Sequence, residues 1–193
     1  MRLLPKLLLT LLLSVPALLF SQLSDRATVT LLTCGSGDEL YSVFGHTAIR
    51  VADPASGVDT VYNFGTFDFS TPNFYLKFVK GDLQYFVSVG PYDDFVEEYR
   101  YFGRDVFAQQ LNISTGQKQA IYDELNSILL SDRRFYTYKF IDRNCTTMVA
   151  DIINKYAGPV SMQNSDAGKT NRTIIYSYLD NHFFENLGIN LIF

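Results

Sequence analysis

A cysteine at the predicted first turn of a helix is the most constraining feature of this sequence. Asn144 precedes Cys145 and is a favourable N-cap, because its side-chain oxygen can accept from the free N–H groups of the first turn. Apolar residues then recur at helical spacing as far as Tyr156, and the Gly-Pro pair at 158–159 predicts the end of the helix. An extended aromatic run over residues 133–141 leads into it. The positive end of a helix dipole stabilises a thiolate, so this position favours a reactive thiol, although a buried cysteine more often serves as a small core residue.

A histidine opens a predicted strand early in the chain. Residues 47–51 alternate in polarity, which is typical of a strand, so His46 is expected at the start of this strand. A turn over residues 53–57 separates this strand from a second one over residues 58–64, and the resulting hairpin brings Asn63 beside His46. On its own, such a histidine is more often a hydrogen-bonded structural residue than a catalytic one.

Together, the cysteine and the histidine predict a Cys–His nucleophile pair. One comes from a helix and the other from a strand, as this chemistry requires. His46 would take the proton of Cys145 and later return it to the leaving group. Asn63 would hold the imidazole in its useful tautomer, with Asp68 as the second choice. The backbone N–H of Cys145 and a neighbouring donor would meet the oxyanion, and this thioester route serves hydrolysis and acyl transfer equally well.

A disulfide is the rival interpretation of the two cysteines. In an oxidising compartment a Cys34–Cys145 bond would leave no free nucleophile, and the domain would be a binding or structural module. No cofactor or metal site is predicted, because the chain has two histidines and two cysteines and lacks CxxC, HExxH and phosphate-loop patterns. The second histidine, His182, lies in a polar segment without a motif, and a GxSxG serine hydrolase motif is absent.

Residues 1–21 are predicted to be a secretory signal rather than part of the fold. They carry Arg2 and Lys6 before an uncharged apolar stretch that is shorter than the roughly 20 residues of a membrane span. Their removal changes the net charge from −4 (16 basic and 20 acidic residues) to −6 (14 basic and 20 acidic). Residues 22–193 are expected to form a single domain, whose acidic charge argues against nucleic-acid binding. A membrane surface stays open as a partner, because residues 67–81 mix aromatic residues with lysines, although core packing is the preferred interpretation.

Short motifs distributed over nearly the whole of residues 22–193 form a specific combination. They include FGHTAIRV at 44–51, VYNFGTFDF at 61–69 and DRNCTT at 142–147, with shorter matches at 32–35, 39–41, 73–75, 80–81, 109–112 and 136–138. In this combination the sequence resembles the bacterial family of Lnb-type N-terminal periplasmic domains.

This resemblance implies an α+β fold of the papain-like NlpC/P60 kind in the LRAT-like order, with an antiparallel sheet packed against helices and the cysteine at a helix N-terminus. It implies lipoprotein N-acylation, in which an acyl chain passes from a phospholipid donor to a cysteine as a thioester, and then to the N-terminal amine of a lipoprotein acceptor. Cys145 would be the nucleophile, His46 the base and Asn63 the orienting residue.

The resemblance also implies a location and leaves one rival reaction. The expected location is the periplasm, at the outer face of the inner membrane. Relatives of this type continue into transmembrane helices, so one expectation is that this chain is a fragment lacking them. Amide hydrolysis of a cell-wall peptide stays open as the alternative reaction, because it needs no membrane segment.

Overall fold

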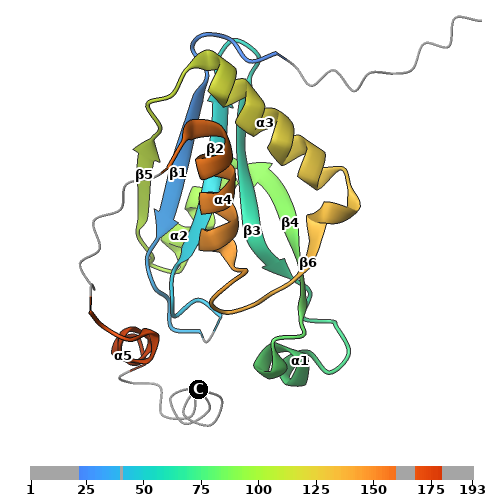
Figure 1. Cartoon of the computed structure of the whole chain (residues 1–193), viewed down its shortest axis with the longest axis vertical. Coiled ribbons are helices and arrows are strands. Elements are labelled where there is room, and N and C mark those ends of the chain that lie inside the picture. The colour runs from blue at the N-terminus through green and yellow to red at the C-terminus, as the bar shows by residue number, and fades with distance from the viewer. Residues whose placement is uncertain (1–21, 40, 160–167, 180–193) are drawn as a thin grey trace, which may run out of the picture.

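One antiparallel sheet organises the domain. The structure is a computed structural model, and it describes residues 22–39, 41–159 and 168–179. Within these residues, six strands lie in the order β5-β1-β2-β3-β4-β6 (Figure 1). They are β1 (Thr28–Cys34), β2 (His46–Asp53), β3 (Val58–Phe67), β4 (Gln84–Pro91), β5 (Val106–Gln110) and β6 (Phe135–Thr137). The predicted α+β class, with an antiparallel sheet packed against helices, is therefore confirmed.

Helices cover both faces of this sheet. They are α1 (Phe74–Lys80), α2 (Tyr92–Tyr101), α3 (Thr115–Leu129), α4 (Cys145–Ala157) and α5 (Asn171–Ser177), with a 3-10 turn η1 (Asp132–Arg134). α3 and α4 pack on one face over the larger hydrophobic core, and α2 packs on the other face over a smaller core. α1 and α5 lie beyond the end of the sheet at which α4 begins (Figure 1).

The central strand β2 is buried on both faces, which fixes its register. Ile49 and Val51 belong to the larger core and Ala48 to the smaller one, and each is 0% exposed. Full burial of a side chain the size of isoleucine stabilises a fold by about 1.5–3 kcal/mol, so a slip by one residue would be costly. The register therefore holds His46 at the end of the sheet that faces the start of α4.

The extended run predicted over residues 133–141 is only partly correct. Residues 132–134 form η1 and only Phe135–Thr137 is a strand, after which the chain turns until α4 begins. β6 is an edge strand that pairs with β4 over three residues. Arg134 donates from Nε to the carbonyl oxygen of Val87 at 2.9 Å, which anchors the chain before this short strand. The turn follows because the chain must leave the sheet edge to enter α4.

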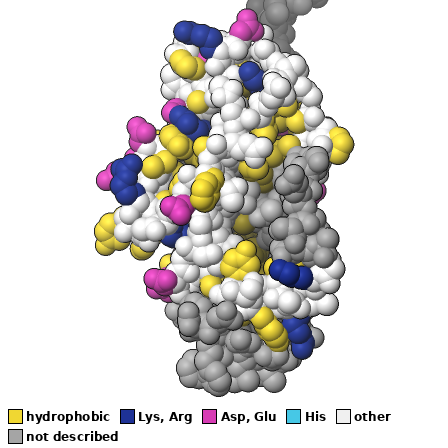
Figure 2. Space-filling view, turned by 90° about the vertical axis from the view of Figure 1, so that its left-hand side faces the viewer, with side chains coloured by type: hydrophobic (Ala, Val, Ile, Leu, Met, Phe, Trp, Pro, Cys, Tyr) yellow, Lys and Arg dark blue, Asp and Glu magenta, His cyan; other side chains and the backbone are white. Residues whose placement is uncertain are grey.

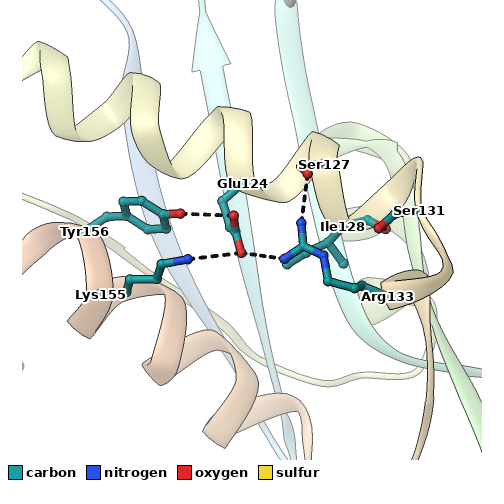
Figure 3. A network of polar contacts seen from close by, with 7 residues as sticks. All are labelled: Glu124, Ser127, Ile128, Ser131, Arg133, Lys155 and Tyr156. Carbon is teal, nitrogen blue, oxygen red and sulfur yellow. Dashed lines mark hydrogen bonds and ion pairs between the residues drawn. The ribbon is translucent and has the colours of Figure 1, made fainter.

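A polar network joins α3 to α4 and fixes the position of α4 (Figure 3). Glu124 of α3 accepts from Nη1 of Arg133 at 2.8 Å and from the Tyr156 hydroxyl at 3.0 Å. Lys155 lies 3.5 Å from the same carboxylate, and Arg133 also donates to Ser127 at 2.8 Å. The Glu124 side chain is 15% exposed, whereas those of Arg133 and Lys155 are 52% and 60% exposed, so the network lies at the surface with only its carboxylate largely covered. The orientation of α4 on the sheet is thus set at its C-terminal end by this network.

The predicted signal segment at residues 1–21 and the residue His182 lie outside the described residues. None of the described helices is both long enough and apolar enough to span a membrane.

Candidate active site

A capping box fixes Cys145 as the first residue of α4. The Asn144 side chain accepts from the N–H of Thr147 at 2.9 Å, and the N–H of Asn144 donates to the Thr147 hydroxyl at 2.9 Å. Asn144 also donates from Nδ2 to the carbonyl oxygen of Phe140 at 2.8 Å, which ties the helix start to the preceding turn. The predicted cap and both predicted ends of this helix are confirmed. Cys145 consequently sits at the positive end of a helix dipole of 13 residues.

His46 is held at the start of β2 by a hydrogen bond to the neighbouring strand. Its Nε2 lies 2.7 Å from Oδ1 of Asn63 on β3, as the hairpin predicts. Gly65, two residues further along β3, leaves space for the imidazole, since a Cβ at that position would lie 2.8 Å from Cε1 of His46. Gly45 precedes the histidine with φ 75°, and a Cβ there would lie 2.6 Å from the carbonyl oxygen of Cys34. Two glycines therefore permit the position of this ring.

The bond to Asn63 determines the tautomer of His46. An amide oxygen can only accept a hydrogen bond, so Nε2 of His46 carries the proton and donates it to Asn63. Nδ1 is then unprotonated in the neutral ring and is the nitrogen available to the thiol of Cys145. This tautomer is the one that a general base for the thiol requires.

The surroundings of Cys145 favour its thiolate. Burial acts to raise the pKa of the thiol, but the hydrogen bond and charge of His46, the backbone N–H of Thr47 and the hydroxyl of Thr146 together hold that pKa below its ordinary value. The hydroxyls of Thr47 and Thr146 lie 3.0 Å apart and join β2 directly to the first turn of α4. The thiol is therefore placed and activated by the same strand that carries the histidine.

Cys34 has the opposite environment. It is 3% exposed and packs in the smaller core with Leu32 and Tyr99, whereas Cys145 packs against the larger core. Burial raises the pKa of the Cys34 thiol to about 11, so this thiol stays protonated. Both cysteines of the sequence lie in the described part of the chain, and both are free. The geometry thus favours the reactive-thiol interpretation of Cys145 over the Cys34–Cys145 disulfide.

Asp68, the second choice for orienting the histidine, is engaged elsewhere. Its exposed carboxylate accepts from the N–H of Ser70 at 2.8 Å and from the Ser70 hydroxyl at 2.7 Å. These two bonds hold the pKa of Asp68 below its ordinary value. The structure brings Asn63, and not Asp68, to His46.

Cys145 and His46 open into a pocket of about 310 Å³. Its walls come from the loop before β2, from β3 and β4, from the turn before α4 and from α5, and they are mainly aromatic and aliphatic. These wall residues are Tyr41, Phe44, Phe67, Tyr85, Tyr138, Phe140, Ile174, Ile175 and Tyr178. The volume lies at the lower end of the range typical of small-ligand sites. An apolar group beside the thiol would be shielded from water there.

The described residues contain no group of three or more His, Cys, Asp and Glu side chains that could hold a metal ion. On the face of the molecule seen in Figure 2, acidic, basic and hydrophobic side chains are intermixed, so this face carries no single-sign charged patch. The thiol, the imidazole and the apolar pocket are the features of this site that can take part in a reaction.

Comparison with known proteins gives one match. No curated protein and no solved structure matches this chain. The model of the Lnb N-terminal periplasmic domain matches residues 21–179, which include Cys145, His46 and Asn63. This match agrees with the resemblance carried by the short motifs, and it supports an exported, periplasmic location. The chain therefore belongs to the Lnb N-terminal periplasmic domain family.

Proposed function

We propose that this domain is a thiol acyltransferase that moves an acyl chain from a phospholipid to the N-terminal amine of a lipoprotein through a thioester on Cys145. The observation that carries the proposal is the line of groups from Asn63 through His46 to Cys145, which ends at an apolar pocket. We propose further that the fold is of the papain-like NlpC/P60 kind in the LRAT-like order, with the histidine strand before the cysteine helix. The site would work at the outer face of the inner membrane, where a phospholipid donor is available.

In the first half-reaction Cys145 takes the acyl group. The thiol proton moves to Nδ1 of His46, and the thiolate Sγ attacks the ester carbonyl carbon of the phospholipid. The C–S bond forms, the C–O bond to the glycerol breaks, and Nδ1 returns the proton to the departing oxygen. The products are an acyl-thioester on Cys145 and a lysophospholipid.

In the second half-reaction the lipoprotein amine takes the acyl group from Cys145. The neutral amine attacks the thioester carbonyl, Nδ1 of His46 removes a proton from the attacking nitrogen, and the C–S bond breaks. The thiolate leaves and recovers a proton from His46, so the cycle ends with an amide and a free thiol. No co-reactant beyond the two substrates is consumed.

Asn63 acts in both half-reactions through the imidazole. Its amide oxygen accepts from Nε2 at 2.7 Å and so keeps Nδ1 directed at the thiol. When Nδ1 gains a proton the ring becomes positive, and the hydrogen bond to the amide oxygen becomes stronger. Asn63 is therefore a positioning residue in this scheme.

The pocket supports an acyl donor over a cell-wall peptide. A muropeptide is polar along its whole length and would need hydrogen-bonding partners in the wall, whereas the wall here is built mainly from rings and branched aliphatic side chains. Burial of each methylene group against such a wall is worth about 0.8 kcal/mol, so an acyl chain gains binding energy for each methylene that the pocket covers.

Two substrates given separately to the purified domain test the proposal. Phospholipid with a labelled acyl chain should label Cys145, and a lipopeptide with a free N-terminal amine should then remove the label as an amide. The Cys145→Ala variant should do neither. Cleavage of a muropeptide amide bond without any acyl transfer would reject the proposal in favour of peptide hydrolysis.

A further inference from the structure

Three tyrosines lie together beside Cys145. They are Tyr85 on β4, Tyr136 on β6 and Tyr138 in the turn before α4. The rings of Tyr85 and Tyr138 stack with their centroids 4.5 Å apart, and those of Tyr85 and Tyr136 lie 6.1 Å apart. Figure 1 shows β4 and β6 side by side, with the chain from β6 leading directly to the start of α4. Two of the three tyrosines therefore lie in the segment that runs from β6 to Cys145, and the third lies on the adjacent strand β4.

Among the described residues, the hydroxyl of Tyr138 has no hydrogen-bond acceptor. Within the described residues no hydrogen bond is made by this hydroxyl, and its side chain lines the same pocket as Cys145. Tyr136 also has a buried hydroxyl without a partner, but Tyr136 is not among the residues that line the pocket. A polar group placed in an apolar pocket costs free energy unless a ligand supplies the missing partner.

Tyr138 keeps its proton throughout the working pH range. Burial raises the pKa of its phenol, and the negative charge of the Cys145 thiolate raises it further. Burial also raises the pKa of the Tyr85 phenol. There, the charges of the neighbouring Tyr138 and Tyr136 raise the pKa more than the charge of Cys145 does. Of the two tyrosines in this cluster that line the pocket, Tyr138 is therefore the one whose strongest charged neighbour is the nucleophile itself.

The proposed reaction needs a donor at this place. Attack by Sγ turns the carbonyl oxygen of the substrate into an oxyanion, which must be met by preorganised donors close to the thiol. The first-turn N–H groups of a helix lack intrahelical partners, and Asn144 satisfies only that of Thr147. The N–H of Cys145 makes no hydrogen bond within the part of the chain that the structure describes, so it is available as one donor, and a second donor completes the usual pair.

We propose that the Tyr138 hydroxyl is this second donor, and that it binds the oxyanion of both tetrahedral intermediates together with the N–H of Cys145. The inference rests on the proposed function and adds a catalytic residue to it. Tyr85 supports the ring of Tyr138 by stacking and is a positioning residue. No electron or co-reactant is needed, because the hydroxyl keeps its proton while the C–S bond forms and breaks.

The Tyr138→Phe variant isolates the hydroxyl. Phenylalanine keeps the ring that stacks on Tyr85, so the pocket wall and the fold should be retained. Loss of one oxyanion donor typically lowers kcat by about 10²–10³-fold, with little change in substrate binding. The Tyr101→Phe variant is the control for basal activity, because Tyr101 of α2 is 83% exposed and does not line the pocket, so its acylation rate should match that of the wild type. The Tyr85→Phe variant tests whether the other phenol of the stacked pair is the donor instead.

Two reactions of Cys145 separate the role of Tyr138 from the role of the thiol. Acylation by a medium-chain p-nitrophenyl ester passes through an oxyanion, whereas alkylation by iodoacetamide does not. Tyr138→Phe should slow acylation by about 10²–10³-fold and leave alkylation unchanged. The inference is overturned if Tyr138→Phe acylates as fast as the wild type, if alkylation falls as much as acylation, or if Tyr85→Phe carries the loss instead.

A binding experiment tests the donor without requiring turnover. A medium-chain fatty aldehyde adds to Cys145 as a hemithioacetal, and its affinity is read from protection of the thiol against iodoacetamide. Tyr138→Phe should weaken this protection, and equal protection in both proteins would overturn the inference. If the wild type binds the aldehyde through Tyr138 but transfers no acyl group, the proposed function fails while the donor role stands.

Discussion

Replacement of Gly65 by alanine should disable the histidine while leaving the fold intact. A Cβ at this position would lie 2.8 Å from Cε1 and 3.3 Å from Nδ1 of His46. Non-bonded carbon atoms prefer separations of about 3.5–4.0 Å, so the ring must move by roughly 1 Å. The φ angle of Gly65 is not positive, so alanine meets no backbone strain there and the perturbation is steric.

The expected magnitude follows from what the ring would lose. The imidazole is the end of a side chain and can shift at little cost in stability, but the shift breaks the 2.7 Å bond to Asn63 and misdirects Nδ1. A misplacement of this size at a reacting centre costs about 10²-fold in rate. The free energy of unfolding should change much less than it does when a large core side chain is truncated, which costs about 2–5 kcal/mol.

Gly90→Ala is the matched control for this experiment. Gly90 lies on β4 in the same sheet, opposite Val61, and a Cβ there would meet no atom within 4 Å. The assay is the rate of Cys145 alkylation by iodoacetamide as a function of pH, alongside thermal unfolding of each variant. Gly65→Ala should react more slowly near neutral pH and shift the pH profile upward, while Gly90→Ala should match the wild type. An unchanged profile for Gly65→Ala would refute the account of how the ring is placed.

Other substitutions test separate parts of the structure. Asn63→Ala should raise the apparent pKa of Cys145 and slow its alkylation at neutral pH by about tenfold, because the imidazole loses the hydrogen bond that fixes its tautomer. The same pH profile of alkylation measures both effects. Glu124→Gln should lower the free energy of unfolding by about 1–2 kcal/mol in chemical denaturation, because it weakens the charged contacts that join α3 to α4. A change in the alkylation rate of Cys145 without a change in stability would contradict this role of Glu124. Hydrogen bonds from Ser24 hold the pKa of buried Asp53 at about 2, below the ordinary value of about 3.9 in an unfolded chain. The stabilisation by this carboxylate is therefore complete above about pH 4 and is lost as the pH falls toward 2, and Asp53→Asn should flatten this part of the stability curve.

The sequence alone could predict the parts of the site that depend on local signals. The cap at Asn144 and the stop at Gly158 lie next to the residues they control, so both ends of α4 could be predicted. The contact between His46 and Asn63 follows from one short hairpin, since Asn63 pairs with Ala48, which lies two residues along β2 from His46. These features require no knowledge of the rest of the fold.

The pocket could not be predicted, because its walls meet only in three dimensions. Phe44, Phe140 and Tyr178 are far apart in the chain, yet the Phe44 ring lies 4.9 Å from that of Phe140 and 5.8 Å from that of Tyr178. The contact between Thr47 and Thr146 likewise joins two distant segments. Nothing in the local pattern of either partner specifies the other.

The edge strand β5 escaped prediction for a different reason. Four of its five residues are exposed, so it shows no alternation between a buried and an exposed face. Its strand conformation comes from backbone pairing with β1, which hydrophobic periodicity does not report. The role of Gly65 was also hidden, since a glycine in a strand gives no sign of which side chain occupies the space beside it.

The most direct test of the account is the identity of the residue that carries the acyl group. The domain would be incubated with phospholipid, quenched in acid and digested, and the peptide containing Cys145 would be measured by mass spectrometry. The proposed mechanism predicts the added mass of one acyl chain on Cys145. Hydroxylamine should remove this mass, as it does from a thioester, and the His46→Ala variant should lack it. An unmodified Cys145 peptide under conditions that release lysophospholipid, or an acyl chain on another residue, would contradict it.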